Sequence, residues 1–125
     1  GDYDGDGDVD ILVFNTGETL NLFRNDNEAT DINWLWVDLR SNGGNSHGVG
    51  ARLILAANGI EQVRELRGSR SYLSQSDYRV HFGLADAQRA DWLEVHWLSG
   101  LKERYQQLES NQVLRIEEGS GQRIP

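Results

Sequence analysis

The sequence predicts an all-β protein whose main domain is a β-sandwich of about seven strands. After residue 32, short runs of alternating apolar and polar residues follow one another. Turn signals separate these runs, among them Asn58-Gly59, which favours a type I′ hairpin between two apolar segments. No stretch shows the apolar period of a long helix. Short strands with turns at this spacing are typical of two packed sheets.

The N-terminal residues 1–26 predict a loop followed by a β-hairpin. An apolar, β-branched run predicts a strand at Asp10–Asn15, and Leu20–Arg24 is expected to return as its partner after a turn. Residues 27–33 are polar and acidic, so they are predicted to be a linker. The sandwich is then expected over residues 34–118, with residues 119–125 as a tail.

The strand expected at Asn33–Leu39 alternates clearly, as does a strand with one buried face. Its aliphatic face is expected in the core, and its opposite face carries two tryptophans. The two faces are Leu35, Val37 and Leu39 on one side, and Trp34, Trp36 and Asp38 on the other. The segment that follows, residues 41–50, holds four glycines and two asparagines and is predicted to be a flexible loop.

Six further strands complete the predicted sandwich. They are expected at Ala51–Ala57, Ile60–Leu66, Tyr78–Phe82, Trp92–Trp97, Leu101–Leu108 and Val113–Glu117. The alternation at Tyr78–Phe82 predicts that Tyr78, Val80 and Phe82 point inward. Ser99-Gly100 predicts a second hairpin, and Leu84–Asp91 is expected to hold a short helical turn.

The sharpest chemical pattern lies at the start of the chain, where five aspartates occupy alternate positions and glycines stand at positions 5 and 7. Carboxylates this dense repel one another unless a cation lies among them. Hard oxygen ligands of this kind suit Ca²⁺. We expect the side chains of four of them, and the backbone carbonyl of Asp8, to act as ligands. The predicted metal set is Asp2, Asp4, Asp6, Asp8 and Asp10.

Two other interpretations of this loop are less favoured. An EF-hand requires a glutamate at loop position twelve and flanking helices, but that position is Val13, within a predicted strand. A solvated acidic tail is the other alternative. The placed glycines and the strand that follows the loop do not fit a tail.

The chain resembles two known families. The pattern Asp-x-Asp-x-Asp-Gly-x-x-Asp before a strand resembles the calcium loop of FG-GAP/VCBS repeats, which are propeller blades. The segments Gly48–Arg52, Tyr72–Ser76, His81–Leu84 and Trp97–Gly100 resemble the ASPIC/UnbV domain over residues 34–118. In that family the domain commonly follows FG-GAP/VCBS repeats. The resemblance implies a secreted, periplasmic or cell-surface binding module with upstream propeller blades in a longer protein, and no established reaction.

Composition bounds the possible partners. The net charge of −8 arises within residues 1–31, which hold nine acidic residues and one arginine, whereas the rest of the chain is balanced. This distribution argues against nucleic acid as a partner. The chain has no cysteine, and no apolar run has the length of a membrane span.

Several residues outside the loop are candidates for ligand binding. Trp34 and Trp36 could stack on sugar rings, although packing is the more common role of such residues. Tyr72 and Arg70 lie in a serine-rich loop, which could form either a polar ligand site or a hydrogen-bonded cap. His81 and His96 would be neighbours if their strands paired, which would allow a transition-metal site.

The sequence therefore predicts a non-catalytic, calcium-stabilised extracellular adhesion or binding module with a protein or glycan ligand. The alternatives are a carbohydrate-binding module and an accessory domain of a hydrolase or biosynthetic enzyme.

Overall fold

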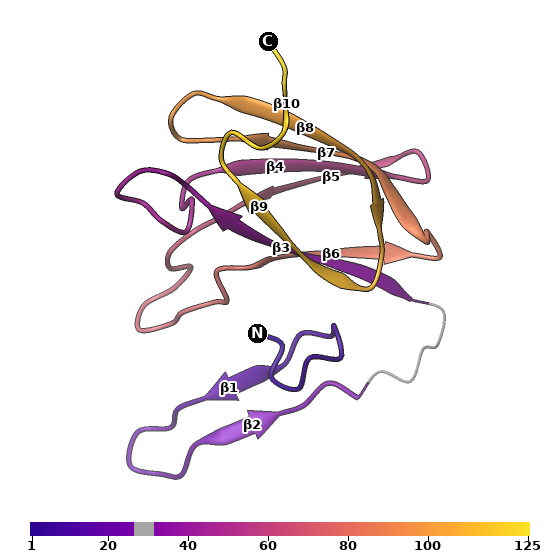
Figure 1. The fold of residues 1–125 in the computed structure, drawn as a ribbon. Coiled ribbons are helices and arrows are strands. Elements are labelled where there is room, and N and C mark those ends of the chain that lie inside the picture. The colour runs from indigo at the N-terminus through magenta and orange to yellow at the C-terminus, as the bar shows by residue number, and fades with distance from the viewer. Residues whose placement is uncertain (27–31) are drawn as a thin grey trace.

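The computed structural model describes residues 1–26 and 32–125, and these form ten strands and no helix (Figure 1). The all-β prediction is therefore confirmed. The strands are β1 (Ile11–Val13), β2 (Asn21–Phe23), β3 (Asn33–Arg40), β4 (Arg52–Ala57), β5 (Ile60–Glu65), β6 (Val80–Ala85), β7 (Arg89–His96), β8 (Lys102–Glu109), β9 (Gln112–Glu117) and β10 (Gln122–Arg123). No helix within the described residues is long and apolar enough to cross a membrane.

Strands β3 to β10 form two sheets that pack face to face in a sandwich-like arrangement (Figure 1). The larger sheet is antiparallel, with the order β10-β8-β7-β4-β5. The smaller sheet has the order β6-β3-β9, and its β3 and β9 are parallel. Strand β3 is therefore the central strand of the smaller sheet, and its two faces decide what that sheet contacts.

The core lies between the two sheets and follows the predicted alternation. Leu35, Val37 and Leu39 of β3 are buried, as expected from their shared face. They pack with apolar residues of β4, β6, β7 and β9 in one continuous cluster. Burying each such side chain contributes about 1.5–3 kcal/mol, so this alternation supplies much of the stability of the sandwich.

Both predicted hairpins are present. Strands β4 and β5 pair around Asn58 and Gly59, whose φ values of 48° and 75° are the positive pair that a type I′ turn requires. Strands β7 and β8 pair across Ser99-Gly100, where Gly100 also has a positive φ. The turn residues thus specify the local connections of the larger sheet.

The structure differs from the sequence prediction in three places, and one further prediction cannot be compared with it. Eight strands follow residue 32, rather than about seven, because the expected tail contains β10, which pairs with β8. The helical turn expected at Leu84–Asp91 is instead the short turn between β6 and β7. Tyr78 is exposed, since β6 begins only at Val80, and its ring stacks on that of His47. Most of the predicted linker, residues 27–31, lies outside the described residues.

The N-terminal hairpin of β1 and β2 lies beside the smaller sheet (Figure 1). The aspartate-rich loop that precedes β1 contacts β3, because the indole Nε1 of Trp36 donates a hydrogen bond to the carbonyl of Gly7 at 3.2 Å. The hairpin itself has exposed apolar side chains on both strands. The loop, rather than the hairpin, therefore makes the contact with the sandwich that positions the candidate site.

Candidate functional site

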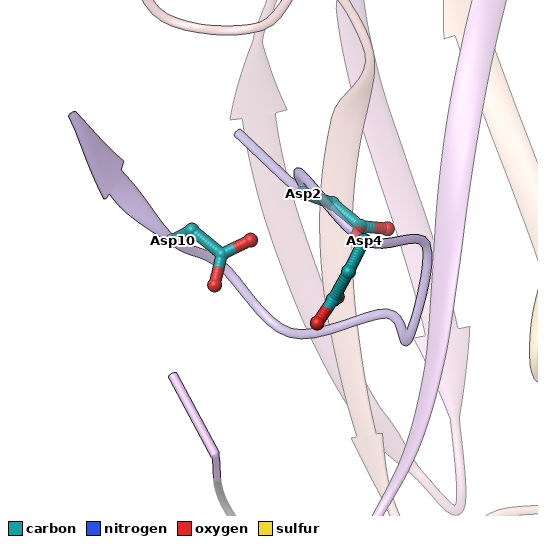
Figure 2. A group of neighbouring side chains, drawn as sticks. All are labelled: Asp2, Asp4 and Asp10. Carbon is teal, nitrogen blue, oxygen red and sulfur yellow. The ribbon is translucent and has the colours of Figure 1, made fainter. Parts of the chain in front are cut away.

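Three of the predicted ligands converge in the N-terminal loop. Asp2, Asp4 and Asp10 each offer a carboxylate oxygen, and these oxygens lie within 4.8 Å of one another (Figure 2). Oxygens bound to one Ca²⁺ at about 2.3–2.6 Å lie at most about 5 Å apart. One cation can therefore contact all three, so the donor chemistry and the spacing fit a hard divalent ion.

The loop holds this arrangement through hydrogen bonds from its own backbone. The amide of Gly5 donates to Asp2 Oδ1 at 2.7 Å, and that of Asp8 donates to Asp6 Oδ1 at 2.9 Å. Gly5 and Gly7 have φ values of 81° and 98°, a region that side chains strongly disfavour. The two glycines therefore permit the turns that bring Asp2, Asp4 and Asp10 together.

Asp10 anchors the loop to its surroundings. It is 4% exposed, and its carboxylate accepts hydrogen bonds from the amides of Tyr3 at 2.7 Å and Asn25 at 2.9 Å. The hydrogen bond from Tyr3 is the largest cause, and that from Asn25 the next, of a pKa of Asp10 below its usual range. A carboxylate kept ionised between two parts of the chain is well placed to meet a cation from the buried side of the loop.

Asp6 and Asp8 lie outside this cluster of three carboxylates. Asp6 is exposed, and one of its oxygens accepts the amide of Asp8. On the other side, the guanidinium of Arg24 lies 3.6 Å from Asp4 and 2.5 Å from Asp26. The side chains that come together are thus Asp2, Asp4 and Asp10, with Arg24 partly balancing their charge.

Gly7 joins the loop to the sandwich. It is buried, and a Cβ placed on it would overlap the indole ring of Trp34. Its carbonyl accepts the hydrogen bond from Trp36 described above. Both tryptophans come from the non-core face of β3, so this face is covered by the loop that carries the aspartates.

Trp36 is enclosed by two more side chains of the sandwich. It is 2% exposed, with the guanidinium of Arg79 at 4.8 Å from its ring centre and the ring of His81 at 4.7 Å. Burial lowers the pKa of His81, which the nearby Gly7 carbonyl partly opposes. Trp36 therefore cannot offer its face to a sugar, and packing is its role.

The serine-rich loop presents the other predicted ligand residues. Ser69 Oγ donates to the carbonyls of Ser71 at 3.1 Å and Ser74 at 3.0 Å, as expected for a hydrogen-bonded cap. Tyr72 projects from this cap with 88% of its surface exposed, and Arg70 is exposed as well. These two side chains are accessible, whereas Trp36 is buried and Trp34 is half-buried.

The model of the family described as ASPIC and UnbV matches residues 41–123, about two thirds of the chain. The chain belongs to the ASPIC and UnbV family. A search among curated proteins found no match. The match begins directly after β3 and extends to β10, so it covers strands β4 to β10 of the sandwich. Strand β3 and the aspartate loop lie before the matched region.

The ASPIC and UnbV sandwich keeps the two histidines apart. His81 is on β6 of the smaller sheet, and His96 is on β7 of the larger one, where its Nε2 lies 3.2 Å from Glu94. A metal site built on paired strands is therefore wrong. The condition for it, pairing between β6 and β7, is not met.

Sequence reasoning missed two polar residues that organise the ASPIC and UnbV domain. Glu103 is fully buried and accepts hydrogen bonds from the Trp97 indole at 2.7 Å and the amide of Gly121 at 2.8 Å. Glu118 accepts from the hydroxyl groups of Ser41 and Ser99, the first at 2.5 Å. The alternation along β8 places Glu103 on the inward face with Tyr105, which is the one signal that pointed to its burial.

Proposed function

We propose that this chain is a non-catalytic, calcium-stabilised binding module that acts outside the cytoplasm as part of a longer FG-GAP repeat protein. The observation that carries the proposal is the cluster of Asp2, Asp4 and Asp10 in a loop that is docked on the sandwich. Membership in the ASPIC and UnbV family is consistent with a role as an accessory domain of a larger protein. A calcium ion and a fixed contact to the sandwich together make the module rigid.

In this proposal the three carboxylates bind Ca²⁺, which supplies positive charge that relieves their mutual repulsion. Asp10 holds its oxygens in place through the amides of Tyr3 and Asn25. Gly7 transmits the order of the loop to β3 through its bond to Trp36. Each of these steps is positional, so the metal has a structural rather than a chemical role.

Two carboxylates of the sandwich, Glu94 and Glu118, are paired with fixed partners. Hydrogen bonds from the hydroxyls of Ser41 and Ser99 lower the pKa of Glu118. Burial raises the pKa of Glu94, but the bonds from Arg104 and His96 outweigh it and lower the pKa overall. In this proposal both carboxylates act as structural ions.

Calorimetric titration with Ca²⁺ after passage over a chelating resin tests the metal part. We expect one site with a Kd of about 10⁻⁴–10⁻³ M, the range of extracellular modules. Asp4→Asn should weaken binding, because it removes one charge from the cluster. Asp91→Asn, an exposed aspartate on β7, is the matched control and should leave the Kd unchanged. Absence of heat at ~10 mM Ca²⁺ would contradict the proposal.

The ligand in this proposal is a protein or a glycan. The accessible ring of Tyr72 favours a contact surface at the serine-rich loop, since aromatic rings are enriched at binding surfaces. A glycan array probed with the chain and with Tyr72→Ala tests the glycan alternative. Binding that Tyr72→Ala abolishes would support a carbohydrate-binding module, whereas no binding would favour a protein ligand.

A further inference from the structure

A cavity of about 340 Å³ lies between the aspartate loop and the sandwich. It is lined by Gly1 and Val9 of the N-terminal segment and by residues 36, 64–67, 70, 76–77 and 79–81 of the sandwich. Four arginines line it: Arg64, Arg67, Arg70 and Arg79. The whole chain has only 12 lysines and arginines and a net charge of −8. A third of its cationic side chains therefore gather at one cavity in an acidic protein.

Two of these arginines are neutralised by neighbours and two are not. Arg67 pairs with Glu65 at 2.9 Å, and Arg79 pairs with Asp77 at 2.6 Å. Arg64 donates to the neutral oxygens of Val63 and Gln62. Within residues 1–26 and 32–125, neither Arg64 nor Arg70 forms an ion pair. The cavity lining therefore has an excess of two positive charges.

Two of the guanidinium groups are held in place before any ligand arrives. Arg79 lies over the ring of Trp36 and donates two of its N–H groups to Asp77. Arg64 lies 5.6 Å from the ring centre of Phe82. Stacking and ion pairing restrict these long side chains, so less entropy is lost when they bind a further group.

A histidine adds an unused polar atom to the same lining. The Nε2 atom of His81 is buried and has no hydrogen-bond partner among the described residues. Buried polar atoms without partners are uncommon in folded proteins. In the tautomer with its proton on Nε2, His81 is a donor in the lining of the same cavity as the four arginines.

We propose that this cavity binds the oxyanion group, a sulfate or a carboxylate, of a small ligand. Arginine donors arranged as planar forks match the oxygens of such groups. The cavity volume is at the lower end of ligand pockets, about 300–1,000 Å³, which suits one charged group and the ring that carries it. The inference rests on the proposed function as a binding module and names the chemistry of its ligand.

Nuclear magnetic resonance titration of the ¹⁵N-labelled chain tests the proposal, because arginine Nε–H and tryptophan indole N–H groups report directly on the cavity. The probes are sodium sulfate in one arm and sodium acetate in the other, with ionic strength held constant by sodium chloride. We expect saturable shifts at Arg64, Arg70, Arg79 and the Trp36 indole. The arm with the lower Kd identifies whether the site prefers a tetrahedral or a planar oxyanion.

Two variants decide whether the arginines carry the binding. Arg70→Ala should weaken it about tenfold, the effect of losing one charge-assisted hydrogen bond. Arg64→Gln provides a second loss of charge that retains hydrogen-bonding capacity. Arg89→Ala removes the same charge from an exposed position on β7, outside the cavity, and should leave the Kd unchanged. Equal weakening by Arg70→Ala and Arg89→Ala would overturn the proposal, as would linear shifts that chloride reproduces.

The titration is repeated with and without Ca²⁺, so that the two proposals fail separately. Most of the cavity lining belongs to the sandwich, so anion binding is expected in the metal-free protein as well. Anion binding in a protein that binds no calcium would leave this inference standing and remove the calcium proposal. Calcium binding without saturable anion shifts would do the reverse.

Discussion

Replacing Gly7 with alanine tests whether the aspartate loop is docked on the sandwich. Gly7 is buried against Trp34, its φ is 98°, and its carbonyl accepts the Trp36 indole hydrogen bond. An alanine at this position would overlap the Trp34 ring and would adopt an unfavourable backbone conformation. The loop must therefore move away from β3 or distort.

The expected destabilisation has three parts. A side chain in the left-handed region costs about 1–2 kcal/mol. Loss of the hydrogen bond from Trp36 Nε1 to the Gly7 carbonyl adds about 0.5–1.5 kcal/mol. Exposure of the tryptophan faces that the loop covers adds more, so we expect Gly7→Ala to lower the free energy of unfolding by about 2–4 kcal/mol.

Gly5→Ala is the matched control for this experiment. Gly5 has a similar φ of 81°, but no atom lies within 4 Å of the position where its Cβ would stand. This variant therefore carries the backbone strain without the clash, and its cost should stay at about 1–2 kcal/mol.

Urea unfolding followed by tryptophan fluorescence provides the assay, because all four tryptophans lie in the sandwich. The emission of Trp34 and Trp36 should also shift to longer wavelength in Gly7→Ala if the loop leaves them exposed. If Gly5→Ala and Gly7→Ala have the same midpoint and spectrum, the docked arrangement is refuted.

Three further predictions concern the contacts that hold the domain together. Glu103→Gln should destabilise the sandwich by about 1–3 kcal/mol, because an amide NH₂ group cannot accept the hydrogen bonds that the buried N–H groups donate to the carboxylate. Glu109→Gln, on the exposed part of β8, is the control and should have little effect in the same urea assay. Trp36→Phe keeps most of the ring but leaves the Gly7 carbonyl without its donor, so a loss of about 1 kcal/mol is expected; an unchanged midpoint would show that the bond adds nothing. Glu118 has a folded-state pKa below the ordinary 4.5, so its contribution to the stability of the fold is present above pH 4.5 and is lost as the pH falls through the folded-state pKa. Between about pH 6 and pH 3, the urea midpoint should therefore fall less steeply in Glu118→Gln than in the unmodified chain, and parallel curves would contradict this assignment.

The sequence predicted best where local pattern decides the structure. Leu35, Val37 and Leu39 follow one another at intervals of two residues, so a strand must place them on one face. In the structure this face is buried in the core. Asn58-Gly59 specified its own turn because both residues adopt positive φ easily. Such features depend on neighbours in the chain, which is why a single sequence is enough to find them.

Long-range features could not be predicted in the same way. The parallel pairing of β3 with β9 joins segments that are more than seventy residues apart in the sequence, and no local sequence pattern predicts it. Tyr78 fits the alternation of the strand that follows, yet its ring stacks on His47 in the glycine-rich loop. Tyr78 stays outside the core because β6 begins only at Val80, a boundary that the alternation does not show.

The candidate metal site was predictable in part. The spacing of the aspartates identified the loop, but the residues that converge depend on how the backbone turns at Gly5 and Gly7. Asp6 lies outside the cluster of three carboxylates, and its part in the ligand set stays a prediction. The arginine cavity was not predicted as a unit, because Arg64 of β5 and Arg79, which precedes β6, line one cavity only in the folded chain.

The most direct test of the account is a pair of thermal melts with and without Ca²⁺, followed by near-ultraviolet circular dichroism. Calcium that binds only the folded state stabilises it by about 2.7 kcal/mol at a hundredfold excess over Kd. Because the loop is docked on β3, we predict that this raises the Tm of the sandwich by several degrees, and that Asp4→Asn reduces the shift. A sandwich melt that does not move, in a sample shown by calorimetry to bind calcium, would contradict the account.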